Sequence, residues 1–155
     1  MEFKRPISVL VVIHTPTFEV VLLERKQHPG FWQSVTGSHE SKESLLTTAA
    51  REVCEETGIT VNESLLLDWH LANRFEIFEE WRQRYAPDVT HNVEHVFSLC
   101  LPETVRLQLS AGEHTAQVWL PYQMAAAKCF SWTNRDAILM LPHIVPIRAD
   151  GSAMP

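Results

Sequence analysis

The chain has 155 residues, of which 45% are apolar and 21% are charged, and its formal net charge at pH 7 is −6. These values predict one folded domain and exclude a disordered, collagen-like or coiled-coil chain. A net-negative protein has little general affinity for nucleic acid or anionic lipid, so we expect neither as a partner. The longest apolar run, Val9–Ile13, is too short to cross a membrane.

The cysteines indicate a compartment. Cys54, Cys100 and Cys129 are an odd number, they include no C-x-x-C pair, and no zinc-ligand spacing is present. We therefore expect reduced thiols in a cytoplasmic protein.

The first part of the chain predicts strands. Ser8–His14 is continuous and rich in β-branched residues, which is typical of a strand buried on both faces. Thr15-Pro16-Thr17 predicts a turn, and Glu19–Arg25 is then expected to be the hairpin partner of the first strand. Phe31–Thr36 is a short aromatic and β-branched segment that runs into Gly37.

The clearest helix is predicted over Ser44–Thr57. Its interior is built from Leu, Ala, Arg and Glu, which favour helix, and Ser41 is a candidate N-cap. Gly58 is the expected stop, because glycine readily takes the left-handed conformation that ends many helices.

The rest of the chain alternates strands and helices irregularly. Further strands are predicted at Leu66–Arg74, Val93–Leu101, Thr104–Leu109 and Gln117–Leu120, and helices at Pro121–Phe130 and Thr133–Leu141. This order predicts a mixed sheet with helices packed on both faces. One domain is expected over residues 1–147, and the polar stretch 148–155, which contains Gly and Pro, is expected to be a flexible C-terminal tail.

Three carboxylates lie on one face of the predicted helix. Glu52, Glu55 and Glu56 are spaced i, i+3 and i+4, so their charges repel one another and also lie near the helix C-terminus, where negative charge is unfavourable. A nearby cation would offset both costs, and clustered carboxylate oxygens suit Mg²⁺ or Mn²⁺ more than Zn²⁺. Taken alone, the same spacing also describes an ordinary solvated acidic face.

The wider pattern favours the metal interpretation. Gly37 is followed by five residues and Glu43, and seven further residues lead to Arg51-Glu52-Val53-Cys54-Glu55-Glu56-Thr57-Gly58-Ile59. This arrangement resembles the Nudix box, G-x5-E-x7-R-E-U-x-E-E-x-G-U with U bulky and aliphatic, at every specified position. A chance match of the fixed positions is on the order of 10⁻⁹ per starting point. Lys42 replaces a glycine that is often found before the first Glu, outside the strict pattern.

The resemblance implies a Nudix hydrolase, an enzyme that splits a diphosphate linkage. The implied fold is α+β, a Nudix-type α/β/α sandwich with a mixed β-sheet and a loop–helix–loop Nudix box. It also implies that Glu52 and Glu56 are the main metal ligands, that Glu55 is a further ligand or a water-positioning base, and that Glu113 joins them around Mg²⁺, with Mn²⁺ as a substitute. Such an ion would neutralise phosphate charge and activate water. As a residue of a turn-like segment, Glu113 could instead be solvated, although the resemblance favours a ligand.

The remaining box residues are implied to support this site. Arg51 would orient the glutamates through ion pairs, and Glu43 would support the start of the helix. Gly37 and Gly58 would permit tight turns at its two ends.

The resemblance extends over roughly residues 4–141. Members of the family that hydrolyse dihydroneopterin triphosphate to the monophosphate and pyrophosphate, in bacterial folate synthesis, are similar in five further segments. These are Lys4-Arg5-Pro6, Phe31–Ser38, Phe75–Phe78, Arg84–Pro87 and Ser131–Arg135.

The residues implied to contact this substrate are Lys4, Arg25, Thr36, Phe75, Glu76, Ile77, Phe78 and Ser131. The two cations would bind a triphosphate. The aromatic rings could wall a pterin ring, and Glu76 could accept hydrogen bonds from it. Each has an ordinary alternative: the cations could be surface charges, the Phe residues core, and Ser131 a helix cap.

Two other functions remain open. One is a general nucleoside triphosphate pyrophosphohydrolase, such as an enzyme that removes dATP, because pterin and purine rings are similar. The other is a Nudix-fold binding module without catalysis, which the intact glutamate cluster disfavours. The oligomeric state is left open.

Overall fold

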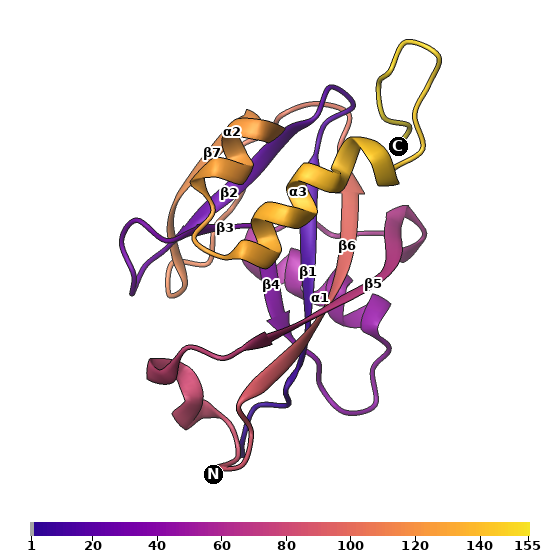
Figure 1. Cartoon of the computed structure of the whole chain (residues 1–155). Coiled ribbons are helices and arrows are strands. Elements are labelled where there is room, and N and C mark those ends of the chain that lie inside the picture. The colour runs from indigo at the N-terminus through magenta and orange to yellow at the C-terminus, as the bar shows by residue number, and fades with distance from the viewer. Residues whose placement is uncertain (1) are drawn as a thin grey trace.

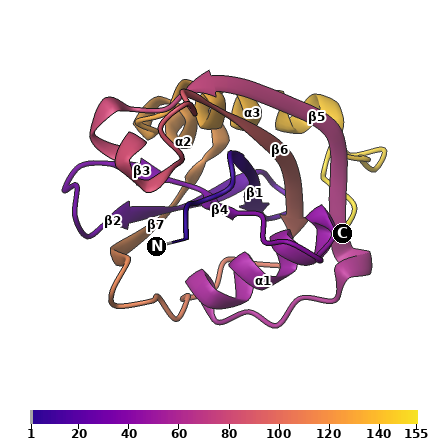
Figure 2. The same cartoon turned by 90° about the horizontal axis from the view of Figure 1, so that it is seen from below.

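The computed structural model describes residues 2–155, and in this part of the chain one mixed seven-stranded sheet separates two helical layers. Helix α1 (Leu45–Thr57) covers one face, and α2 (Tyr122–Lys128) and α3 (Trp132–Ile144) cover the other (Figures 1 and 2). Each face of the sheet has its own apolar core. The predicted α+β fold, with its mixed sheet between helices, is confirmed. No described helix has the length and apolarity that a membrane span requires.

Strand β1 lies at the centre of the sheet. It runs parallel to β6, which pairs on its other side with β5, and β2 carries both β3 and β7. The bounds are β1 (Ile7–His14), β2 (Glu19–Arg25), β3 (Trp32–Gln33), β4 (Val35–Ser38), β5 (Leu66–Glu76), β6 (His91–Cys100) and β7 (His114–Pro121). Two short 3₁₀ helices, η1 (Glu63–Leu65) and η2 (Glu79–Arg84), flank β5.

The expected hairpin between the first two strands is reduced to one pair of residues. Only His14 and Val20 are partners, whereas β2 pairs with β7 along its whole length. The reason is that β4 occupies the N-terminal half of β1, from Ser8 to Val11. The pairing of β4 with β1 thus places Gly37, the first residue of the Nudix box, beside β1.

The strand predicted at Thr104–Leu109 is wrong. The segment has no regular secondary structure and belongs to no ladder, and side chains of β7 bond its backbone instead. Gln117 accepts from the Leu107 N–H at 2.6 Å and donates to the Leu107 carbonyl at 2.8 Å, while the Trp119 indole donates to the Val105 carbonyl at 2.8 Å. The apolar pattern therefore marked burial of Leu107 rather than sheet pairing.

Helix α1 begins one turn later than the candidate cap Ser41. Ser44 is the N-cap, and its hydroxyl accepts from the Thr47 N–H at 3.0 Å. Gly58 ends the helix as predicted, with φ of 77° and its N–H donating to the Cys54 carbonyl at 2.9 Å.

The C-terminal stretch, expected to be a flexible tail, folds back on the domain. Ile147 forms a bridge with Ala153, and the Ala153 N–H donates to the Pro16 carbonyl at 2.8 Å. Ala153 is fully buried in the core beneath α2 and α3. The structure thus gives residues 148–155 contacts that a free tail would lack.

Candidate active site

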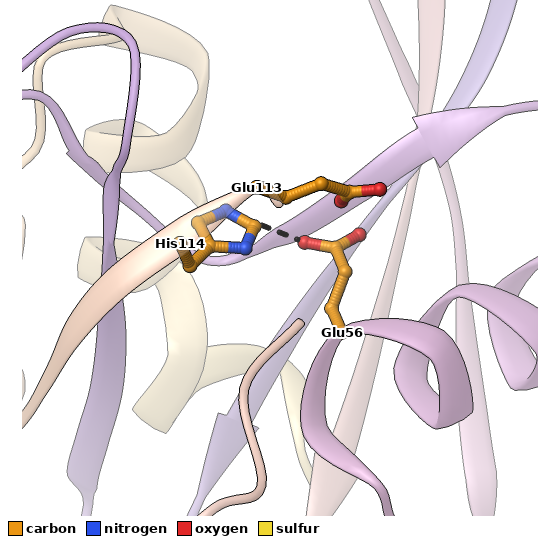
Figure 3. A group of neighbouring side chains, drawn as sticks. All are labelled: Glu56, Glu113 and His114. Atoms are coloured by element: carbon orange, nitrogen blue, oxygen red, sulfur yellow. Dashed lines mark ion pairs between the residues drawn. The ribbon is translucent and has the colours of Figure 1, made fainter. Parts of the chain in front are cut away.

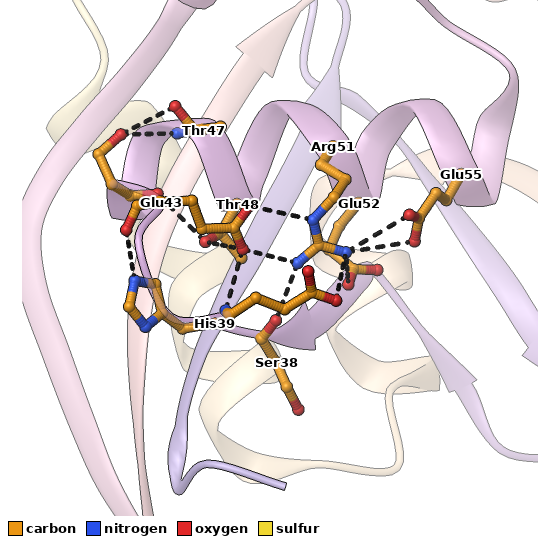
Figure 4. A network of polar contacts seen from close by, with 10 residues as sticks. Ser38, His39, Glu43, Thr47, Thr48, Arg51, Glu52 and Glu55 are labelled. Atoms are coloured by element: carbon orange, nitrogen blue, oxygen red, sulfur yellow. Dashed lines mark hydrogen bonds and ion pairs between the residues drawn. The ribbon is translucent and has the colours of Figure 1, made fainter.

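Arg51 is the hub of the acidic network on α1 (Figure 4). Its guanidinium donates to both oxygens of Glu43 at 2.8 and 3.2 Å and to Glu52 at 2.9 Å. It also donates to Glu55 at 3.4 Å and to the Ser38 carbonyl, in β4, at 3.0 Å. Hydrogen bonds from Arg51 lower the pKa of Glu43 to about 2, so this pair stays charged. This is the geometry that an orienting arginine requires, although its role in catalysis stays a prediction.

The three helix glutamates point from solvent into the protein. The exposed fraction of the side chain falls from 54% at Glu55 to 12% at Glu52 and 1% at Glu56. Burial is the main cause that raises the pKa of Glu52 and of Glu56, and the nearness of the two carboxylates adds to it at Glu56. The unfavourable repulsion between carboxylates that the helix spacing predicts is therefore largest at Glu56.

Gly37 has a different role from the turn that the box pattern implied. Its φ is not positive, but a Cβ at this position would lie 1.9 Å from Cδ of Glu52. The glycine therefore lets β4 approach the Glu52 side chain. Gly58, by contrast, is the left-handed turn residue that the pattern implied.

Glu56 lies close to Glu113 and His114, which come from the turn before β7 and from its first residue (Figure 3). One ligand atom of each lies within 4.8 Å of the others. Neither oxygen of Glu56 forms a well-aligned hydrogen bond with the described residues; the Thr36 backbone N–H is near enough to oppose the rise of its pKa, and Nε2 of His114 is 3.7 Å away. Burial, with the nearby Arg25 charge, lowers the pKa of His114 to about 4. The imidazole is therefore neutral at pH 7 and cannot balance the charge of Glu56.

This donor set fits a divalent cation. A buried carboxylate without partners is costly unless a positive charge faces it, and a neutral imidazole can coordinate metal. Glu113, from the exposed turn before β7, lies beside Glu56, and its role as a metal ligand stays a prediction. Glu52 and Glu55 lie outside this group of three, held by Arg51 instead. His114 was not predicted, although its place next to Glu113 in the sequence was a usable signal.

A cavity of about 860 Å³ opens over these carboxylates. Lys4, Arg25 and Thr36 line it together with the box residues, as does Arg84, which was not predicted as a site residue. Burial, and then the charge of Arg84, lowers the pKa of Arg25. The cavity thus brings cations to an acidic site, which is the arrangement that a bound polyphosphate needs.

A second cavity, of about 420 Å³, adjoins the first and shares Lys4, Arg25 and Thr36 with it. Aromatic rings form one wall: Phe130 stacks on Phe31 with ring centroids 4.6 Å apart, and Phe78 stacks on Trp81 at 5.1 Å. The predicted substrate residues Phe75, Glu76, Ile77, Phe78 and Ser131 all line this cavity.

These five residues differ in their exposure and in the groups that they contact. Strand β5 ends at Glu76, so the chain turns there and buries Ile77, while Phe78 stays 44% exposed. The Glu76 carboxylate pairs with Arg82. Ser131 is the N-cap residue of α3, but its hydroxyl bonds the Thr133 hydroxyl at 2.9 Å rather than a helix N–H.

Comparisons with known proteins show which family and which relatives the chain is similar to. The NUDIX domain model matches residues 4–141. Dihydroneopterin triphosphate diphosphatase of Escherichia coli K12 is 47% identical over 139 residues, covering 88% of this chain and 91% of that protein. The Haemophilus influenzae protein of the same name is 40% identical, covering 89% and 88%. The solved structure of the E. coli dihydroneopterin triphosphate pyrophosphohydrolase superposes with a TM-score of 0.83 at 45% identity, covering 89% of this chain and 95% of that one.

Proposed function

The chain belongs to the NUDIX hydrolase family, and we propose that it hydrolyses dihydroneopterin triphosphate to dihydroneopterin monophosphate and pyrophosphate, in folate biosynthesis. The observation that carries this proposal is the pair of adjoining cavities. One holds carboxylates and cations, and the other has an aromatic wall. A flat ring and a polyphosphate on one molecule match the two halves. The names of the two bacterial relatives support the same substrate.

Glu56 and Glu113, with Glu52 beside them and His114 as a further donor, would hold Mg²⁺ or, in its place, Mn²⁺. Such an ion, when bound, neutralises charge on phosphate oxygens and activates water. The unpartnered oxygens of Glu56 support this assignment.

The protein's own groups have separate tasks in this proposal. Lys4 and Arg25 bind phosphate oxygens as charged donors. Glu55 is the most exposed of the helix glutamates and lines the cavity, so it positions or deprotonates the attacking water. Arg51 hydrogen-bonds both Glu52 and Glu55 and so holds these two carboxylates in fixed relative positions.

The aromatic wall would exclude water from the ring. Phe78, Trp81 and Phe130 present stackable faces, and Phe75 lines the same cavity. A purine ring could stack there as well, so a nucleoside triphosphate such as dATP is the alternative substrate. We also propose a cytoplasmic location, supported by the three free cysteines.

A pyrophosphate-release assay tests this proposal. The purified protein is given dihydroneopterin triphosphate, dATP and the other nucleoside triphosphates, each with Mg²⁺, with Mn²⁺ and with excess EDTA. We expect kcat/KM to be highest for the pterin substrate and activity to vanish in EDTA. A higher value for dATP would make the nucleotide the substrate, and no turnover of any compound would leave a binding module.

A further inference from the structure

Two buried hydrogen-bond acceptors in the aromatic-walled cavity have no donor. Asn92 and Glu94 line this cavity and are 4% and 6% exposed. Oδ1 of Asn92 and Oε1 of Glu94 have no hydrogen-bond partner among the described residues. The two residues are two apart in β6, so their side chains lie on the same face of the sheet. That face is the one covered by α2 and α3, because Val96 continues the series into their core.

The fold satisfies these acceptors only in part, because the one donor near Glu94 is the Thr133 hydroxyl, which opposes the rise of its pKa. Asn92 uses its amide nitrogen to donate to the Ser8 hydroxyl at 2.7 Å, which leaves its oxygen free. No cation within the described chain forms an ion pair with Glu94. The nearby Asn134 shows what a structural amide does here, since both of its ends bond Ser34, at 2.7 and 2.9 Å. Buried acceptors that lack donors are costly, so a ligand that brings donors would relieve the cost.

We propose that Glu94, with Asn92 beside it, determines ring specificity by accepting hydrogen bonds from the donor edge of the substrate ring. This inference rests on the proposed function and deepens it. A pterin carries an amino group next to a ring N–H, which are two parallel donors that match the two oxygens of one carboxylate. The exposed Glu76, which the sequence favoured for this task, is already paired with Arg82.

The surroundings of Glu94 suit this task. The aromatic side chains at the cavity wall can hold a flat ring, which leaves its edge to be read by polar groups at the sheet. Burial raises the pKa of Glu94 to about 7, with a hydrogen bond from the Thr133 hydroxyl opposing the shift, so about half of the Glu94 side chains are charged at pH 7 and most are charged above it. Donors on the ring would favour the charged form further.

The test compares Glu94→Gln with wild type and with Glu103→Gln, a change at an exposed glutamate outside both cavities. Hydrolysis of dihydroneopterin triphosphate and of methyl triphosphate, which has no ring, is measured with Mg²⁺. Binding of dihydroneopterin, which has no phosphate, is measured by calorimetry. For Glu94→Gln we expect KM for the pterin substrate and Kd for dihydroneopterin to rise about 10- to 100-fold. We expect kcat to stay within about 3-fold and methyl triphosphate turnover to be unchanged.

Glu94→Asp keeps the charge and shortens the side chain, so we expect an intermediate loss, and this variant decides the matter if Glu94→Gln does not fold. An equal loss on both triphosphates would give Glu94 a structural role and overturn the inference. Unchanged pterin kinetics and binding would also overturn it, while leaving the proposed function intact. If wild type does not hydrolyse the pterin substrate yet binds dihydroneopterin through Glu94, the proposed function fails and the ring site stands. If wild type does neither, both fail.

Discussion

Both carboxylate oxygens of Glu56 are buried without a partner, and its neighbours Glu52 and Glu113 carry the same charge. Glu56→Gln keeps the shape of the side chain and removes its charge. We expect kcat to fall at least about 10²-fold, because charged groups at such sites are typically worth several kcal/mol. Glu103→Gln is the matched surface control. Circular dichroism should show a folded variant, and a kcat within a few-fold of wild type would remove Glu56 from the metal site.

Glu94 makes stability depend on pH. Burial raises its pKa from 4.5 to about 7, so the folded protein keeps a proton that the unfolded chain releases between these values. The contribution of Glu94 to the free energy of unfolding is therefore full below pH 4.5 and is lost as pH rises through about 7. Glutamine does not titrate. Relative to wild type, Glu94→Gln should gain roughly 3 kcal/mol between pH 4 and pH 8.

Urea unfolding at several pH values in EDTA measures this gain. Glu52, Glu56 and Glu43 titrate in both proteins, so their contributions cancel in the difference. A difference that is independent of pH would mean that Glu94 is not the titrating group. With the ring-binding test, the result would show whether one residue weakens the empty protein in order to recognise the substrate.

At the scale of elements, features set by nearby residues were predictable and long-range pairing was not. Helix α1 follows from its helix-forming residues and its Gly58 stop, both of which act within a few positions. The main partner of β2 is β7, which lies about a hundred residues further along the chain. The sequence pattern favoured the adjacent β1 as the partner instead. Residues 104–109 have strand-like alternation, but side chains of Gln117 and Trp119 replaced the ladder.

In the candidate site, too, the contacts between residues close in the sequence were predictable and those between distant segments were not. The resemblance to the Nudix box implied that Glu43, Arg51 and Glu52 act together. Arg51 and Glu52 are neighbours on one helix, and Glu43 directly precedes the N-cap of that helix, so all three are close in the sequence as well. The ring cavity is assembled from β1, β5, β6 and the start of α3, and no spacing in the sequence shows that Glu94 lies there. A polar side chain at a core-facing position of a strand, as in Asn92 and Glu94, was the available signal.

Gly37 couples β4 to α1. A methyl group there would lie within 2.4 Å of three side-chain atoms of Glu52. Gly37→Ala should therefore displace Glu52 and weaken Mn²⁺ binding by about 10-fold or more, in line with the effect of groups that position metal ligands. Glu103→Gln is the control, since this exposed residue lines neither cavity. Paramagnetic resonance of free Mn²⁺ measures both affinities, and equal values would refute the steric role.

At the scale of the whole molecule, the sheet separates two kinds of task. The carboxylates come from α1 and the turn before β7, whereas the ring cavity is lined in part by the start of α3, a helix that covers the opposite face of the sheet from α1 (Figure 2). Lys4, Arg25 and Thr36 line both cavities and so stand where a substrate would cross from one to the other. A net charge of −6 thus coexists with an anion site, because the cations are concentrated at the crossing.

The C-terminal segment has no residue in either cavity, so its removal should separate stability from activity. Deletion of residues 148–155 removes the buried methyl of Ala153 and the backbone bonds to Pro16 and Pro146. A buried methyl is worth about 0.8 kcal/mol and each such bond about 1 kcal/mol, while the freed segment regains chain entropy.

We therefore expect the free energy of unfolding to fall by roughly 1–2 kcal/mol, with kcat/KM unchanged. Urea unfolding and pyrophosphate release measure the two quantities on the same preparation. Ala153→Gly, which removes only the methyl, should give the smaller part of the loss. If the deletion leaves stability unchanged, these contacts contribute nothing in solution, and residues 148–155 are the flexible tail that their composition predicts.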